Sequence, residues 1–245
     1  MKREPSASSA RSRPEPEFFS PQVAAARRFY LNLQPLRNAK LAVVCGGLEH
    51  CRPDYAINRT TFPFYSIEYV ARGLGELQLN GRKHSLQPGR LFAYGPRVPQ
   101  HITGSPDDPL VKYFVDFAGT EAPPLLHACG LAPGRVAQVF PPNAVTALFD
   151  ELISAGLHGG QRGTKLSAAL LNCLAQKIIL AAAPLTGAET LAFGTYHNVA
   201  LTSKKISFAC GRWSKSRKNV TPTTPTFAAS TAAMTTRRRI STCCG

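Results

Sequence analysis

Three residues near position 50 have side chains that bind transition metals. Cys45, His50 and Cys51 lie within seven positions of one another. A structural zinc site uses four nitrogen or sulfur ligands in a tetrahedral array, and two of its cysteines are usually paired as Cys-x2-Cys. This segment has neither the fourth ligand nor that pairing. The residues therefore allow either a metal site or ordinary packing of Cys45 with the other two at the surface, where Cys51 could be a reactive thiol.

The elements that would position these side chains are short strands. Between residues 55 and 117, β-branched and aromatic residues alternate with polar ones, as half-buried strands require. Asn80-Gly81 separates two of the apolar runs and predicts a hairpin, since a type I′ turn needs positive φ at both central residues. With the apolar segment 40–45 as a first strand, the pattern predicts a small β-barrel.

Two amphipathic helices are expected after the barrel. Asn143 is a candidate N-cap for apolar residues that recur at helical spacing up to residue 157, and Gly159-Gly160 ends that helix. A second helix over 164–182 completes an antiparallel hairpin. Its apolar stripe either packs on the barrel or forms a dimer contact. The candidate dimerisation residues are Leu170, Leu171, Leu174 and Ile178.

Charge is unevenly distributed along the chain. The formal net charge is +15 over 245 residues, but nine of the 29 Lys and Arg and none of the 14 Asp and Glu follow Glu189. The first 190 residues thus carry only +6. The seven cysteines show no disulfide spacing, the N-terminus lacks the apolar core of a signal peptide, and no apolar run approaches the ~20 residues of a membrane span. We therefore expect a cytoplasmic protein with reduced thiols.

The order of N-terminal arm, barrel and helical hairpin resembles the sensor half of the AraC (arabinose-regulator) family of transcription factors. The motifs that carry the resemblance are Ile57-Asn58-Arg59, Arg72-Gly73-Leu74-Gly75, Asn80-Gly81-Arg82, Gln87-Pro88-Gly89-Arg90-Leu91-Phe92, Pro99-Gln100-His101 and Tyr113-Phe114-Val115-Asp116-Phe117. The resemblance covers about residues 40–183. It implies a mainly β fold with helices, in which a cupin-like jelly-roll β-barrel precedes the helical hairpin, and a homodimer that binds a small effector, often a sugar.

The resemblance also implies where the effector binds. The positions of this chain that match the family's effector-binding residues are Arg59, His101, Lys112 and Phe114. Their chemistry suits a sugar, because Arg and Lys can donate to several hydroxyls and an aromatic ring can pack on a sugar face. Arg59 could instead be a solvated surface charge, and Phe114 could belong to the core. Lys112 and Phe114 replace the arabinose sensor's His and Trp, which implies a different effector. No catalytic residue, metal or cofactor is expected.

A complete family member continues into two helix-turn-helix units that bind DNA. Residues 191–200 suit the first helix of that domain, but from about Ile206 the chain has no acidic residue and no apolar periodicity. If the codons from Arg212 onward are read in a shifted frame, codon degeneracy allows them to encode an amino-acid sequence with the family-like runs R-L-Y-R-R and T-P-x-x-Y-L. We therefore hypothesise that residues after about Ile206 are an out-of-frame translation of the helix-turn-helix domain, and as translated we expect a disordered basic tail.

Two other functions remain as alternatives. A cupin-type metal-dependent enzyme acting on a small carbohydrate would need clustered ligands, and the barrel offers only His84 and His101, which are not arranged as His-x-His. The second alternative is a domain that binds a ligand but regulates no other domain. The predicted organisation is a disordered segment 1–20, an arm 21–39, an effector-binding barrel 40–122, a dimerisation hairpin 123–185, the start of a DNA-binding domain 186–205 and the out-of-frame tail 206–245.

Overall fold

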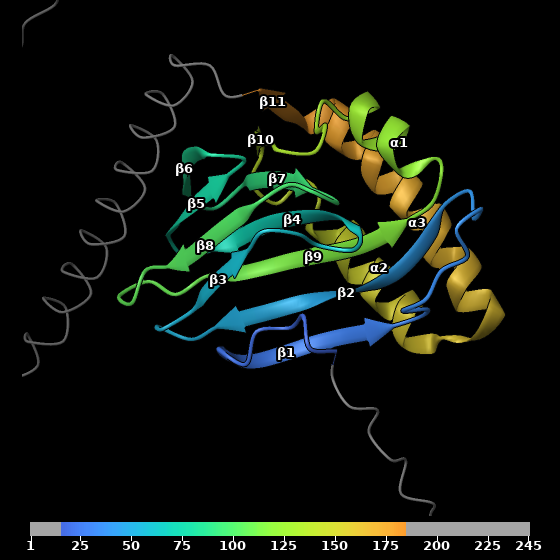
Figure 1. The fold of residues 1–245 in the computed structure, drawn as a ribbon, viewed down its shortest axis with the longest axis horizontal. Helices are drawn as coiled ribbons and strands as arrows, with labels where there is room; N and C mark the ends of the chain where they lie inside the picture. The colour runs from blue at the N-terminus through green and yellow to red at the C-terminus, as the bar shows by residue number, and fades with distance from the viewer. Residues whose placement is uncertain (1–15, 185–245) are drawn as a thin grey trace, which may run out of the picture. The chain divides into compact units, whose positions relative to one another are not determined.

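Two antiparallel sheets lie face to face, with helices against the outer face of the larger one (Figure 1). The computed structural model describes residues 16–184. Most of the predicted disordered segment 1–20, and all of 186–205 and 206–245, lie outside the described residues. The large sheet has the order β1 (Val23–Tyr30), β2 (Ala42–Cys51), β9 (Val111–Ala118), β4 (Tyr65–Arg72), β7 (Arg90–Tyr94), β10 (Arg135–Val139), β11 (Ala182–Pro184). The small sheet has the order β3 (Ala56–Arg59), β8 (Gln100–Gly104), β5 (Gly75–Leu79), β6 (Arg82–Leu86).

The period-two alternation of β9 explains how the large sheet serves two cores. Tyr113, Val115 and Phe117 belong to the cluster packed under the helices. Lys112 and Phe114 lie on the opposite face, toward the small sheet, because successive side chains of a strand point to opposite sides. One strand thus contributes an apolar row to the helix side and a mixed row to the space between the sheets.

The predicted Asn80-Gly81 hairpin is present between β5 and β6. Asn80 has φ 49° and Gly81 has φ 78°, the left-handed backbone that a type I′ turn requires. Leu77 and Leu79 of β5 are fully buried, whereas the alternate residues are exposed. The small sheet therefore presents one apolar face to the large sheet and one polar face to solvent.

The helical hairpin is also confirmed. Helix α2 (Thr146–His158) ends at Gly159, which has φ 62°, and α3 (Gly160–Ala181) returns antiparallel to it. A further short helix, α1 (Ala122–Ala128), has Pro123 and Pro124 in its first turn, where the missing N–H of a proline has no partner to lose. No helix among residues 16–184 is long and apolar enough to cross a bilayer.

Two local features go beyond what the pattern predicted. Residues 23–30 of the arm form β1, an edge strand paired with β2, and β2 extends past the predicted segment 40–45, through Gly46-Gly47, to Cys51. A Cβ on Gly46 would lie 2.8 Å from the Phe29 ring of β1, so this glycine permits close strand contact. Phe29 also packs on Gly156 of α2, where a Cβ would lie 2.1 Å from its ring. Contacts made across the fold therefore decide both features.

Candidate functional site

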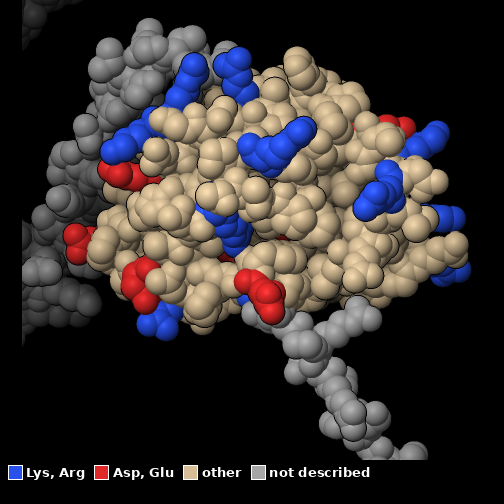
Figure 2. Space-filling model, viewed as in Figure 1, with Lys and Arg blue, Asp and Glu red and all other residues tan. Residues whose placement is uncertain are grey.

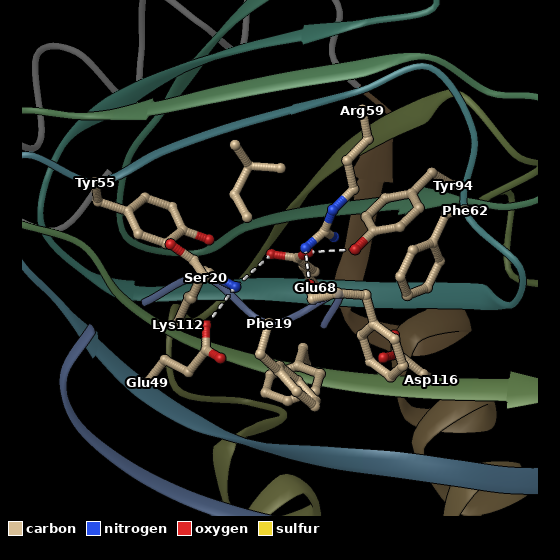
Figure 3. A pocket seen from close by; sticks show the side chains of 13 residues that line it. Phe19, Ser20, Glu49, Tyr55, Arg59, Phe62, Glu68, Tyr94, Lys112 and Asp116 are labelled. Carbon is tan, nitrogen blue, oxygen red and sulfur yellow. Dashed lines mark hydrogen bonds and ion pairs between the residues drawn. The ribbon is translucent and has the colours of Figure 1, made fainter. Parts of the chain in front are cut away.

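A small cavity of about 20 Å³ lies between the two sheets and is partly open to solvent. Charged and hydroxyl groups share its walls with aromatic rings, and two consecutive phenylalanines from the segment before β1 enter it (Figure 3). It is lined by Phe18, Phe19, Ser20, Glu49, Tyr55, Ile57, Arg59, Phe62, Glu68, Tyr94, Lys112, Phe114 and Asp116. This combination suits a ligand with polar groups on a compact skeleton.

Lys112 is the centre of a buried charge network. Its Nζ lies 2.9 Å from Glu49 Oε2 and 3.0 Å from Glu68 Oε2, and all three side chains are 4–5% exposed. Glu49 is the direct cross-strand neighbour of Lys112, whereas Glu68 is its diagonal neighbour on the other side. The Tyr94 hydroxyl donates to Glu68 Oε1 at 2.5 Å. Strand register therefore brings the four groups together.

The network keeps its charges despite burial. Burial alone would lower the pKa of Lys112, but the charges of Glu49 and Glu68 outweigh it and raise that pKa well above its ordinary value. Burial would likewise raise the pKa of Glu49, but Lys112 and Arg28 lower it. Arg28 Nη2 lies 2.8 Å from Glu49 Oε1. The amine and this carboxylate are thus charged at neutral pH.

Asp116 differs from the other buried acids. Burial raises its pKa to about 7. Its direct cross-strand neighbour Cys45 donates the thiol proton to Oδ2 at 3.2 Å, and burial raises the pKa of that thiol as well. Asp116 therefore changes its ionisation near neutral pH while Cys45 stays a thiol.

Arg59 reaches the cavity from the small sheet (Figure 3). Its guanidinium carbon lies 5.2 Å from the centre of the Phe62 ring, and Nη2 donates to the backbone carbonyl of Phe18. The cation is thus held over an aromatic face by a segment from outside the barrel.

Phe18 and Phe19 line the cavity and pack against its other aromatic side chains. The Phe18 ring packs edge-on against Phe62, with 5.6 Å between ring centroids. The Phe19 ring lies 5.6 Å from that of Phe114, and the Arg28 guanidinium lies 4.6 Å from its centroid. The segment thus forms part of the cavity wall and is held by Phe114 and Arg28 of the large sheet and by Phe62 of the loop between β3 and β4.

The structure brings together three of the four residues for which the resemblance implied an effector role. Arg59, Lys112 and Phe114 line one cavity, and Phe114 also belongs to the core between the sheets. His101 does not line it. Its cross-strand neighbours are Asn58 and Gln78, on the outer face of the small sheet, since Gln100 and Ile102 take the inward positions of β8.

Sequence reasoning missed the acidic half of the site. Glu49, Glu68 and Asp116 are almost fully buried and lie in strands whose other residues are mostly apolar. An acidic residue at an inward position of a strand must find a partner, which was the available signal. Most strands of the large sheet are buried on both faces. Hydrophobicity therefore does not distinguish the positions that face the small sheet from those that face the helices.

The candidate metal ligands remain apart. Cys45 and Cys51 are buried in the core between the sheets, so the expected surface position is wrong for Cys51, while His50 is exposed. His84 pairs with inward Leu77, so it lies on the face opposite to His101. Within residues 16–184, no group of three or more His, Cys, Asp or Glu is arranged to hold a metal.

The helical stripe packs mainly on the barrel. Leu171, Leu174 and Ile178 are fully buried in the core under the large sheet, and Leu170 packs against its margin. These three buried side chains are unavailable to a partner in this arrangement. Leu166 and Leu180 of α3 are 52% and 84% exposed.

Comparisons with individual known proteins give only partial matches, at low identity. No curated protein matches the chain significantly. Solved structures that match include the plu4264 protein from Photorhabdus luminescens (17% identity, TM-score 0.30, covering 40% of this chain and 76% of that one). KdgF from Halomonas sp. matches with 20% identity, TM-score 0.27 and coverage of 33% and 72%. A cupin domain of an XRE family transcriptional regulator from Enterobacter cloacae matches with 15% identity, TM-score 0.27 and coverage of 31% and 80%.

A family description matches much more of the chain. The description "AraC-like ligand binding domain" covers residues 44–176, which include most of both sheets, Glu49, Arg59 and Lys112, and nearly all of the helical hairpin. The match extends over more than half of the 245 residues. The chain therefore belongs to the family of proteins with an AraC-like ligand binding domain.

Proposed function

We propose that residues 16–184 form the effector-sensing and dimerisation part of an AraC-type transcriptional regulator, and that the effector is a sugar or a close derivative. The observation that carries this proposal is the cavity in which Lys112 lies between Glu49 and Glu68. Burying ions costs several kcal/mol each, and a well-packed apolar core is often at least as stable. Charged groups around a cavity are therefore more readily explained by ligand recognition than by stability.

A ligand would act by changing the position of the N-terminal segment. Phe18 and Phe19 line the cavity, so a ligand of sugar size competes with them for space. The segment leads directly into β1, which packs on α2 through Phe29 and Gly156. Differential affinity for the two positions of the segment would shift their populations, as a ligand-driven switch requires.

Thermal unfolding with a carbohydrate panel tests the sensing role. A sugar that binds only the folded state raises the melting temperature in a concentration-dependent way. Lys112→Met, which removes the central amine, should abolish that shift, whereas Lys83→Met on the exposed hairpin should preserve it. Absence of a response across neutral, acidic and amino sugars would contradict the proposal.

The proposed dimer uses the exposed side of α3. Leu166, Leu170, Cys173 and Leu180 recur at helical spacing along this side, with Leu170 partly buried and the others exposed, and the exposed Lys177 lies among them. A mainly apolar row in solvent is typical of an interaction surface. Sedimentation of the wild-type chain and of Leu180→Glu checks this assignment, and a monomeric wild-type chain would contradict it.

DNA binding is proposed only for the in-frame form of the gene product, which would act in the cytoplasm. The reasoning for residues 206–245 rests on the sequence, because they lie outside the described residues. The nucleotide sequence of codons 203–246 tests it. A stop codon in the alternate frame, or codons that do not encode helix-turn-helix residues, would contradict the frameshift.

We propose binding rather than catalysis for the cavity. Three of the charged groups in it are paired with one another, since Lys112 lies within 3.0 Å of both Glu49 and Glu68. Figure 2 shows Lys and Arg spread over one face of the molecule rather than collected in one continuous patch, so a polyanion surface is not part of the proposal. Metal analysis of the purified protein, with turnover assays on any sugar that binds, checks the absence of enzymatic activity.

A further inference from the structure

We propose that the effector is a hydroxylated acid with a single negative charge, such as a sugar acid, and that Arg59 binds its carboxylate. This inference rests on the proposed sensing role of the cavity and specifies the chemical class of the ligand. It is carried by the way in which the charges around the cavity are paired.

Two cations, Lys112 and Arg59, line the cavity, and a third, Arg28, is paired with the lining residue Glu49; of these three cations, two already have acidic partners. Lys112 lies within 3.0 Å of both Glu49 and Glu68, and Arg28 lies 2.8 Å from Glu49. Arg59 forms no ion pair with any acidic side chain of residues 16–184, and its partner there is the Phe18 carbonyl. Arg59 is therefore the cation that a ligand anion can neutralise without breaking an existing pair.

The present partner of Arg59 occupies the place of a ligand oxygen. The Phe18 carbonyl comes from the segment that a ligand must displace, since Phe18 and Phe19 line the same cavity. Once that carbonyl leaves, the half-buried guanidinium needs a new acceptor. A carboxylate is the best replacement, because it accepts two parallel N–H bonds from the planar guanidinium, which a single hydroxyl cannot do.

The charge balance favours one negative charge rather than two. With Arg28 included as the partner of Glu49, although it does not line the cavity, Arg28, Lys112 and Arg59 supply three positive charges, and Glu49 and Glu68 supply two negative ones. Asp116 adds part of a further negative charge at neutral pH. A phosphate dianion would exceed the one surplus cation and would be repelled by the acids, so a carboxylate fits better than a phosphate.

The remaining groups suit hydroxyls. Glu68 Oε2 is buried, lies 3.0 Å from the Lys112 ammonium and accepts no hydrogen bond of regular geometry from the described residues. It can accept from a hydroxyl, while the Lys112 ammonium can donate to another oxygen. The rings of Phe62, Tyr94 and Phe114 supply apolar walls against C–H faces. A purely apolar acid would leave the polar groups without partners.

Matched ligand pairs test the inference by isothermal calorimetry. Each acid is compared with a neutral molecule of nearly the same shape: D-glucuronate with D-glucuronamide, D-galacturonate with D-galactose, and D-gluconate with D-sorbitol. We expect one acid to bind at least 10-fold more tightly than its neutral partner. Arg59→Gln should remove that difference, and Arg59→Lys should restore part of it because a charge without the planar fork remains.

The controls separate this inference from the proposed function. Arg82→Gln replaces an exposed arginine on the small sheet and should keep the preference for the acid. The unfolding midpoints of the Arg59 variants show whether they remain folded. Equal binding of acid and neutral partner, or a preference that persists in folded Arg59→Gln, overturns the inference and leaves the sensor proposal standing. Failure of every acid and every neutral sugar to bind overturns both.

Discussion

Lys112 and Glu49 are direct cross-strand neighbours on β9 and β2, and their charged atoms lie 2.9 Å apart with both side chains almost fully buried. Glu68 lies 3.0 Å from the same amine on the other side. Removing one partner of a buried ion pair leaves an uncompensated charge, which costs about 3–5 kcal/mol. The relationship between these residues therefore predicts a large effect of a single substitution.

Lys112→Met should lower the free energy of unfolding by about 3–5 kcal/mol near neutral pH. Urea unfolding monitored by circular dichroism measures it. The loss should shrink toward pH 4, because without Lys112 the burial of Glu49 raises the pKa of that carboxyl, and its protonation removes an uncompensated negative charge. Lys83→Met, at an exposed position of β6, should be nearly neutral. A stability loss that does not depend on pH would mean that packing rather than charge carries the effect.

Phe19→Ala should increase effector affinity. The Phe19 ring contacts Phe114 and the Arg28 guanidinium, so its loss weakens the segment that competes with the ligand. Weakening that segment by about 1–2 kcal/mol raises affinity roughly 5- to 30-fold if the cavity is mostly closed without ligand. Calorimetric titration measures the change, with Leu36→Ala, 74% exposed, as the matched control. Lower affinity would show that the ring binds the ligand instead of competing with it.

Asp116→Asn should change how stability depends on pH. The pKa of Asp116 is raised from 3.8 to about 7, so the folded state retains its proton more strongly than the unfolded state. This group's contribution is fully present below pH ~4 and is lost as pH rises through about 7. As the pH rises from 5 to 8, the free energy of unfolding of the variant should therefore increase relative to that of wild type by on the order of 2–3 kcal/mol.

Denaturant unfolding at pH 5, 6, 7 and 8 measures this difference. Asp54→Asn provides the control, because Asp54 forms an exposed pair with Arg52 and should show no such trend. Parallel stability curves for wild type and Asp116→Asn over this range would contradict the prediction.

Cys173 should form a disulfide across the proposed dimer interface. Leu166, Cys173 and Leu180 follow one another at intervals of seven residues along α3, about 10 Å apart. In an antiparallel contact centred on Cys173, Leu166 of one copy meets Leu180 of the other and the two thiols adjoin. Mild oxidation followed by a non-reducing gel should show a covalent dimer.

The cross-linking experiment uses a chain in which Cys210, Cys243 and Cys244 are replaced by Ser. Burial raises the pKa of Cys51 to about 12 and that of Cys129 to about 11, so these thiols should react slowly. Cys173→Ser should abolish the dimer band, and Leu180→Glu should weaken it. A dimer band that survives Cys173→Ser would place the contact elsewhere.

The local sequence pattern was sufficient to predict several elements of the fold. Asn80-Gly81 predicts its hairpin because few other residues adopt positive φ at both turn positions, and Gly159 marks the end of α2 for the same conformational reason. The apolar spacing of 145–157 and 164–182 predicts α2 and α3 because it makes one face of each helix hydrophobic. Such features depend on neighbours within a few residues.

Which surface each of those elements packs against could be seen only in the tertiary structure. The stripe with Leu174 and Ile178 has the same pattern whether it faces a sheet or a second copy, and packing assigns it to the sheet. The arm becomes β1 because β2 offers an unpaired edge and Gly156 leaves room for Phe29. His101 resembles a site residue in sequence, but its register with Gln78 places it on the outer face.

By itself, the sequence predicted a β-barrel followed by a helical hairpin, and its family resemblance implied Arg59, His101, Lys112 and Phe114 as effector-binding residues, of which His101 lies outside the cavity. Only the tertiary structure decided that the other three residues share a cavity with Glu49, Glu68 and Asp116. The physical reason is register: alternation along a strand allows two faces, and pairing with neighbouring strands selects which residues meet. Strand pairing joins positions more than 60 residues apart, such as Glu49 and Lys112, and no local pattern encodes that distance.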